Sequence, residues 1–173
     1  MATAHPSDAL LAAYASGTTS EGLTLLVSSH LTLCPTCRAA VEDMEAVGGH
    51  LLAESQKVAM SAGALDAVLS RLDTNMPDNV DAAPAIDLDD DLPLPLVVRT
   101  ALGHAARDIN WQFRMPGIHE AELDGFAEGE EVSLLRARPG TTMLAHTHTG
   151  DECTLILPGE MPDGNRVFRP GAL

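Results

Sequence analysis

The stretch His30-Leu-Thr-Leu-Cys34-Pro-Thr-Cys37 brings together three side chains of the kind that bind metal ions. If the residues before Cys34 are helical, His30 and Cys34 lie on one helix face, one turn apart. Cys37 follows across a tight turn and can reach the same point. A fourth ligand, His5, would complete a tetrahedral His2Cys2 set, which is the closed geometry of structural zinc sites. The sequence therefore predicts that the part of the chain before residue 75 consists of helices held by one zinc ion.

A Cys-x-x-Cys pair can also be a thiol redox pair, with two histidines nearby by chance. In thioredoxin-like folds such a pair follows a strand and opens a helix, whereas here a helix comes before it. Zinc is therefore the favoured interpretation, although spacing supports His5 less than the other three ligands. A redox switch, in which Cys34 and Cys37 release zinc and pair on oxidation, stays open as an alternative.

Apolar residues at helical spacing predict three helices around this stretch and a fourth after it. The first covers residues 7–16 with Ser7 as its N-cap, and the second is broken at Cys34-Pro35. The third covers 35–47, with Val47 facing inward, and stops at Gly48-Gly49. The fourth is capped by Ser61 and carries an apolar stripe: Leu65, Val68, Leu69 and Leu72. Because aromatic residues make up only 3% of the chain, the core of this block is thin and a metal ion has a structural role.

The composition changes twice after the helical block. Residues 76–95 combine proline with clustered aspartate and no helical period, which predicts an extended acidic linker. Residues 96–173 contain short apolar runs between glycine and proline turns, which is typical of a β-meander. Its expected strands lie near 109–114, 117–123, 131–138 and 153–157, and another is expected to start near Val167-Phe168. Cys153 is expected to pack in the core. The predicted fold class is α+β in two domains: a zinc-pinned helical bundle over 1–75 and a β domain over 96–173.

A second group of metal-type residues follows the pattern Gly140-x5-His146-x-His148-x3-Glu152-x6-Gly159. Two histidines separated by one residue project from the same side of a strand. A carboxylate just beyond them can join the same ion, and this ligand set suits several divalent metals. An exposed polar turn is the alternative. The remaining histidines, at positions 50, 104 and 119, have no ligand-like spacing and are expected at the surface.

The formal charge of −15, from 10 basic and 25 acidic residues, argues against direct binding of nucleic acid. An acidic protein can still act on transcription by covering the basic surface of a DNA-binding protein. No apolar run is long enough for a transmembrane helix, and the N-terminus does not resemble a signal peptide. Three cysteines, two of them in one metal-type motif, fit a reducing compartment. We expect a cytoplasmic protein without a membrane partner.

The order His5, His30-x3-Cys34-x2-Cys37 on a helical block resembles the zinc-binding anti-sigma domain. The pattern from Gly140 to Gly159 is similar to the first motif of the cupin β-barrels. The two motifs, joined by a linker, resemble the ChrR-type anti-sigma factors over nearly the whole chain. The segment Ser7-Asp-Ala-Leu-Leu supports this resemblance.

The resemblance implies that the helical domain sequesters an extracytoplasmic-function (group IV) sigma factor, with the fourth helix packing separately against it. It also implies a cupin-like domain that is needed for release of the sigma factor under oxidative stress, from singlet oxygen or organic peroxide. His5, His30, Cys34 and Cys37 would bind zinc. In the cupin domain His146, His148 and Glu152 would bind a second divalent metal, with zinc as the first choice.

Cupin metal sites usually take a fourth ligand, a histidine from a second motif on a later strand. This chain ends before that position, so we expect an incomplete barrel and an incomplete metal site. A metal-dependent cupin enzyme, such as a dioxygenase with an accessory zinc domain, is the alternative function. The missing ligand argues against it, as does the expected absence of an aromatic or basic substrate pocket. The favoured function is a regulatory protein and not an enzyme.

Overall fold

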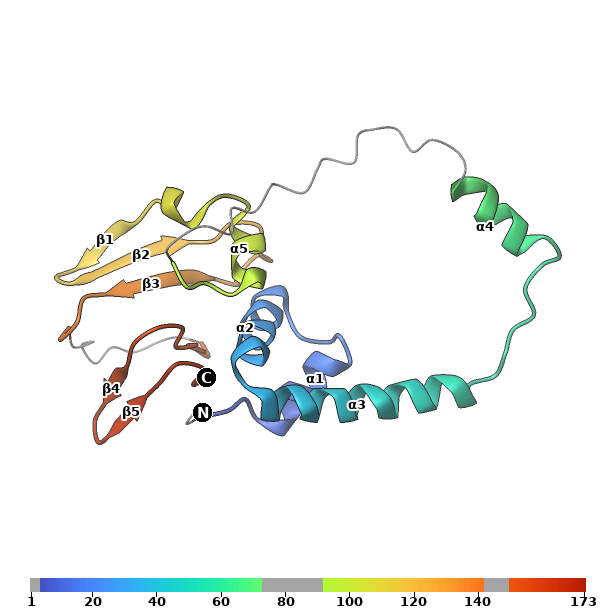
Figure 1. Ribbon diagram of the computed structural model, residues 1–173, viewed down its shortest axis with the longest axis horizontal. Coiled ribbons are helices and arrows are strands. Elements are labelled where there is room, and N and C mark those ends of the chain that lie inside the picture. The colour runs from blue at the N-terminus through green and yellow to red at the C-terminus, as the bar shows by residue number, and fades with distance from the viewer. Residues whose placement is uncertain (1–3, 73–91, 142–149) are drawn as a thin grey trace.

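The computed structural model describes residues 4–72, 92–141 and 150–173, and the predicted α+β fold class is confirmed (Figure 1). Helices α1 to α3 form a block beside the C-terminus, α4 stands apart from it, and α5 lies between the block and a sheet. The helices are α1 (Asp8–Ala15), α2 (Glu21–Leu33), α3 (Pro35–Glu54), α4 (Ala64–Leu72) and α5 (Leu96–Leu102), followed by a short 3-10 helix η1 (Ala106–Asp108). The strands are β1 (Gln112–Met115), β2 (Ile118–Glu122), β3 (Ser133–Ala137), β4 (Met161–Asp163) and β5 (Arg166–Phe168).

Serine residues begin the first two helices, because a serine hydroxyl can accept a hydrogen bond from an otherwise unpaired N–H of the first turn. Ser7 accepts from the Leu10 N–H at 3.2 Å, which confirms the predicted N-cap of α1. Ser20 accepts from the Leu23 N–H at the start of α2. The junction between α2 and α3 is a single residue, Cys34, and Pro35 takes the first position of α3, where its missing N–H does no harm.

Helix α3 is longer than its sequence predicts. The expected stop at Gly48-Gly49 is wrong: both glycines are helical, neither has a positive φ, and the helix continues to Glu54. Each helical glycine costs only about 1 kcal/mol relative to alanine, so two of them weaken a long helix without ending it. Val47, predicted to face inward, is 62% exposed because this half of α3 projects beyond the block.

Helix α4 forms where a fourth helix was predicted, but Ser61 is not its N-cap. The Ser61 carbonyl accepts a hydrogen bond from the Ala64 N–H in a turn through Gly63, whose φ is +81°. No residue of α4 is buried. The apolar stripe of this helix is therefore present and faces away from the rest of the described chain.

The core of the helical block is small and includes two of the predicted metal ligands. Its buried members are Leu11, Val27, Cys34, Cys37 and Val41. Leu10, Tyr14 and Met44 pack against them from the sides. With so few buried apolar side chains, this block has little hydrophobic stabilisation of its own.

Strands β1, β2 and β3 form an antiparallel sheet in sequence order. One sheet face packs on Ala106 and Ile109, which together with Ala121 form a second core. Leu92 and Leu94 also pack against this core. The described end of the predicted linker, residues 92–95, is therefore tied to the second half of the chain. Helix α5, which the sequence did not suggest, completes this layer.

The strand expected at residues 153–157 does not form. Only Ile156 pairs there, donating to the Ala172 carbonyl at 3.0 Å and accepting from the Gly171 N–H at 2.8 Å. The strand expected near Val167-Phe168 does form, as β5 paired with β4. Cys153, predicted to pack in the core, is exposed. The prediction was wrong because residues 151–155 have no flanking strand in the described chain to bury them.

The two halves touch each other along α2. Helix α5 packs directly on α2, and the C-terminal residue Leu173 donates its N–H to the Ala4 carbonyl at 3.4 Å. Figure 1 shows the C-terminus beside the helical block, near the segment that leads into α1. Among the described helices, none combines the length and the apolar character that crossing a membrane requires.

Candidate metal centre

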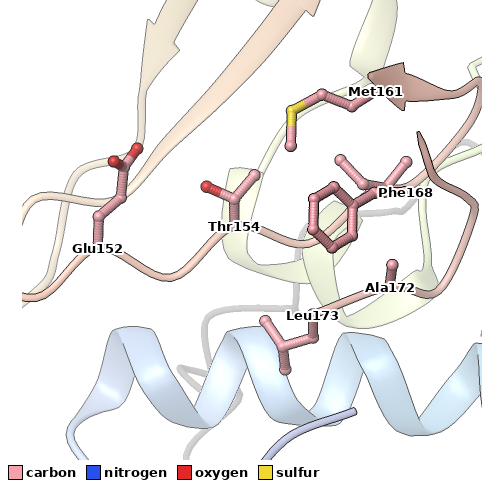
Figure 2. A pocket seen from close by; sticks show the side chains of 7 residues that line it. Glu152, Thr154, Met161, Phe168, Ala172 and Leu173 are labelled. Carbon is pink, nitrogen blue, oxygen red and sulfur yellow. The ribbon is translucent and has the colours of Figure 1, made fainter. Parts of the chain in front are cut away.

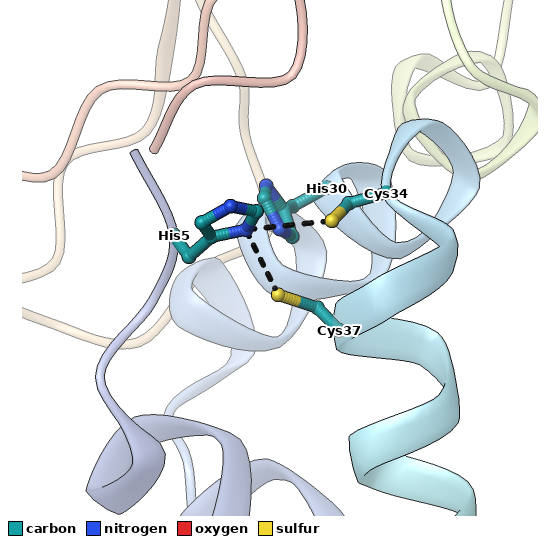
Figure 3. Close-up of side chains that lie close together, drawn as sticks. All are labelled: His5, His30, Cys34 and Cys37. Carbon is teal, nitrogen blue, oxygen red and sulfur yellow. Dashed lines mark hydrogen bonds between the residues drawn. The ribbon is translucent and has the colours of Figure 1, made fainter. Parts of the chain in front are cut away.

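Four side chains from three chain segments meet at the junction of α2 and α3 (Figure 3). His30 lies in the last turn of α2, Cys34 joins the two helices, and Cys37 lies in the first turn of α3. His5 comes from the segment before α1 and points at the two sulfur atoms. The i, i+4 spacing of His30 and Cys34 and the tight turn to Cys37 produce the arrangement that the sequence predicts.

The distances fit a tetrahedral ion. The four ligand atoms lie within 4.8 Å of one another. His5 Nδ1 is 3.2 Å from Cys37 Sγ and 3.4 Å from Cys34 Sγ. Bonds of about 2.0 Å from zinc to nitrogen and about 2.3 Å to sulfur give ligand separations of about 3.3–3.8 Å. These four residues can therefore hold one metal ion with little movement.

His30 shows the strongest sign that an ion belongs here. The residue has 0% exposure, and neither ring nitrogen has a partner in hydrogen-bond geometry within the described residues. Burial lowers its pKa, an effect that the backbone of Gly171 opposes and the charge of His5 reinforces. A buried imidazole with two unmet nitrogens is costly, and a neutral imidazole is the form that binds metal.

The thiols need a cation in order to ionise. Burial raises the pKa of Cys37 to about 11, with further increases from Cys34 and then Asp8. A thiol in that position stays protonated at neutral pH unless a cation stabilises the thiolate. A divalent metal supplies that charge, and its binding displaces the thiol protons.

The centre is closed rather than open. Four protein ligands fill a tetrahedron and leave no position for a water molecule or a substrate. Three of the four residues are buried, and both cysteines belong to the core of the block. The arrangement suits an ion that holds helices together and does not suit a catalytic ion.

The second half of the chain covers this centre. Ala172 is 1% exposed, Gly171 lies beside the His30 ring, and Leu173 pairs with Ala4, the residue before His5. Backbone groups next to a ligating histidine fix its ring orientation and tune the bound metal. The surroundings of the metal centre therefore include residues from both halves.

The opposite end of α2 is also held by the second half. Glu130 accepts a hydrogen bond from the Ser20 hydroxyl, across a separation of 110 residues. This bond, followed by the backbone N–H groups of Gly22 and Leu23, lowers the pKa of Glu130. A Cβ atom on Gly22 would stand 2.7 Å from Glu130 Oε1 and 2.7 Å from Val132 Cγ2, so only glycine permits this approach. The carboxylate complements the positive end of the helix dipole.

The predicted cupin-type ligands are only partly within the described chain. His146 and His148 lie outside the described residues. Glu152 is exposed at one end of a depression of about 310 Å³ whose wall also includes Thr154, Met161, Phe168 and Leu173 (Figure 2). The structure places Glu152 on this wall.

Two features were missed by sequence reasoning. The contact between Glu130 and α2 carries no local signal, since its partners are far apart in the chain. Sequence reasoning, which found no evident aromatic or basic substrate pocket, also missed a depression of about 380 Å³ lined by Trp111, His119, Arg136 and Arg138. The alternating pattern of β1 to β3 was visible, but the pairing of the strands was not.

Comparison with known proteins agrees with this architecture. Residues 100–173 match the sequence profile of the ChrR cupin-like domain. The anti-sigma-E factor ChrR of Cereibacter sphaeroides is 39% identical over 168 residues, which cover 96% of this chain and 76% of that protein. A crystal structure of Rhodobacter sphaeroides SigE in complex with the anti-sigma ChrR matches with a TM-score of 0.80 and 34% identity, over 99% of this chain and 85% of that one.

Proposed function

Because the chain belongs to the ChrR-type family of anti-sigma factors, we propose that it sequesters an extracytoplasmic-function (group IV) sigma factor and thereby regulates transcription. The matching solved structure is that of a relative bound to SigE. Inhibition works by occlusion: the bound sigma factor cannot make its contacts with RNA polymerase. The function is one of binding, which agrees with a metal centre that has no open position.

The observation that carries this proposal is an exposed apolar surface over residues 47–72, which we call the apolar arm. Nine of the fourteen large apolar residues that are exposed in the described chain lie there. A monomeric protein rarely exposes so much apolar surface in one segment unless a partner covers it. Its members are Val47, Leu51 and Leu52 on α3, Val58 and Met60 after it, and Leu65, Val68, Leu69 and Leu72 on α4.

The form of α4 fits a partner groove. Its four exposed apolar residues are spaced as one stripe, and an amphipathic helix of this kind binds by laying that stripe into a hydrophobic groove. The net charge of −15 favours a partner with a basic surface, such as a protein that binds DNA. A sigma factor, as a protein that binds DNA, fits this description of the partner.

The metal at His5, His30, Cys34 and Cys37 is proposed to be zinc in a structural role. Two thiolates and two imidazoles in a closed tetrahedron favour zinc among the common divalent ions. The four residues then act as a pin that fixes α2 and α3 and so positions the start of the apolar arm.

The second half is proposed to release the sigma factor under oxidative stress, from singlet oxygen or peroxide, in the cytoplasm. We keep the predicted division into an anti-sigma domain (1–75), a linker (76–95) and a cupin-like domain (96–173). His146, His148 and Glu152 are proposed to bind a second divalent metal there. Glu130 and Gly171 contact the two ends of α2, so a change in this half can reach the helical block through these contacts.

The proposal is tested by co-expressing the full chain with the sigma factor encoded beside its gene and measuring capture and inhibition of transcription. The variant Leu65→Asp/Leu69→Asp places two charges in the stripe of α4. We expect affinity for the sigma factor to fall at least about 100-fold, since two central apolar contacts are lost.

The matched control is Val167→Asp, which changes an exposed apolar residue outside the apolar arm. It should bind the sigma factor like the unchanged chain. Metal content and far-UV circular dichroism should be the same for all three proteins. Undiminished binding by the double variant would place the partner surface elsewhere.

A further inference from the structure

A row of side chains crosses the face of the β1–β2–β3 sheet. Phe113 on β1 is directly opposite His119 on β2, and His119 is directly opposite Arg136 on β3. Residues opposite one another in an antiparallel sheet project from the same face and touch. The ring centroids of Phe113 and His119 are 6.1 Å apart in an edge-to-face arrangement. Two aromatic rings and a guanidinium group thus share one surface.

Two more side chains turn this row into a hollow. Trp111 and Arg138 line a depression of about 380 Å³ together with His119 and Arg136. The guanidinium carbon of Arg136 lies 5.9 Å from the centroid of the Trp111 ring, a cation–π distance that holds the group in place. The Arg138 N–H donates to the Gly117 carbonyl at 2.8 Å, which fixes the backbone at the rim.

This hollow carries positive charge, whereas the chain as a whole is negatively charged. Two other arginines of this half are paired, Arg114 with Glu120 and Arg169 with Glu160. Arg136 and Arg138 form no ion pair within the described residues, although the chain has 25 acidic residues and 10 basic ones. Two neighbouring guanidinium groups repel each other, and an anion bound between them would remove that repulsion.

Aromatic surface is concentrated at the same place. The chain has three phenylalanines, one tryptophan and one tyrosine, and Trp111 and Phe113 both belong to this patch. Phe113 is 69% exposed, which is costly for so large an apolar side chain. The volume is at the lower end of that of small-molecule sites. A hollow of this size fits a small molecule better than the flat surface of a partner protein.

We propose that Trp111, Phe113, His119, Arg136 and Arg138 form a binding site for a small organic carboxylate with an apolar body. The two guanidinium groups pair with the carboxylate, since their planar donors match its two oxygen atoms. The indole and phenyl rings cover the apolar part, and His119 lies between the two regions. The site is separate from the metal centre and from the apolar arm, so it stands whether or not the chain inhibits a sigma factor.

Trp111 is the only tryptophan, so its fluorescence reports on this site in the intact protein. The probe is octanoate, with octanol as an uncharged match and inorganic phosphate as an anion without an apolar body. We expect a saturable fluorescence change with octanoate, and a heat of binding by calorimetry with one site per chain. Octanol and phosphate should each bind at least about tenfold more weakly.

The variant Arg136→Gln/Arg138→Gln should weaken octanoate binding at least about tenfold while keeping the circular dichroism spectrum. Arg166→Gln, an exposed arginine on β5, is the matched control and should bind normally. If octanol bound as tightly as octanoate, the site would be only an apolar patch. If phosphate bound as tightly as octanoate, it would be only an adventitious anion site. No binding by either method, or undiminished binding by the double variant, would overturn the proposal.

Discussion

The two ends of α3 lie in opposite surroundings. Its first turns hold Cys37 and Val41, each 4% exposed and packed in the core beside the metal centre. Its last turns hold Val47, Leu51 and Leu52, each more than 60% exposed. One helix therefore belongs to the stabilised core at one end and to the apolar arm at the other.

This contrast separates two uses of apolar surface. At the end beside the candidate metal centre, burial within the chain stabilises the fold, and a bound ion would supplement a core of few side chains. Along the apolar arm, the same residue types remain in water, which is unfavourable by roughly 25 cal/mol for each Å². A partner that buries these residues removes this unfavourable free energy, which therefore contributes to binding.

The largest effect is expected at the metal end. The variant Cys34→Ser/Cys37→Ser removes two ligands, and structural zinc contributes about 10–16 kcal/mol in small zinc domains. This matches or exceeds the whole stability of a typical domain. We expect loss of the bound metal and of the helical signal of the block, measured by elemental analysis and far-UV circular dichroism.

Cys153→Ser is the control for this change, because Cys153 is exposed and outside the metal centre. It should keep the metal, the spectrum and the melting temperature. If the double variant lost its metal but kept the spectrum and the binding of the sigma factor, the ion would not be needed to hold the helical block together.

A smaller effect is expected where the second half holds α2. Glu130→Ala removes the carboxylate at the helix N-terminus and should destabilise the contact by about 1 kcal/mol, the usual size of a lost cap. Gly22→Leu should act more strongly, by about 1–3 kcal/mol, since its side chain would overlap with Glu130 and Val132. Faster amide hydrogen exchange in the first turn of α2 is the measurement.

Glu131→Ala is the matched control, since Glu131 is the exposed neighbour of Glu130. The pKa of Glu130 is lowered, so its contribution is complete above the ordinary glutamate pKa and disappears as the pH falls through the lowered value. The difference between the Glu130→Ala protein and the unchanged chain should therefore be the same at pH 7 and pH 6. A difference that vanished at pH 6 would contradict this contact.

The smallest effect on global stability is expected in the apolar arm. Gly48→Ala/Gly49→Ala should strengthen α3 by up to about 1 kcal/mol for each residue, and nothing lies within 4 Å of either added Cβ atom. Helical content should rise, while the melting temperature of the metal-held core stays nearly the same. A large rise in that temperature would mean that the apolar arm and the core unfold together.

The grouping of the predicted ligands at the end of α2 was predictable because its signal is local. His30, Cys34 and Cys37 lie within three helical turns, so spacing alone fixes their relative positions. His5 was the least certain ligand, since the path from His5 back to α2 depends on how α1 packs. The N-cap of α1 was predictable from Ser7 itself. The position of α4 was predictable from the spacing of its apolar residues.

The remaining features depend on competition between distant parts of the chain. The continuation of α3 through Gly48-Gly49 depends on a cost of about 1 kcal/mol for each glycine, too small to decide a helix end from sequence. The pocket arises only when three strands pair in one register, which brings Phe113, His119 and Arg136 into line. The contact of Glu130 with Ser20 has no short-range pattern at all.

The separation of Ser20 from Glu130 also sets an order of events during protein synthesis. Domains fold as they leave the ribosome, which adds about 5–20 residues per second. Ser20 therefore emerges about 5–20 s before Glu130, which is 110 residues later. During that interval the nascent helical block can take up its metal while the far side of α2 is still uncovered. The newborn chain thus exposes its helical block before the residues that contact α2 from the second half have been synthesised.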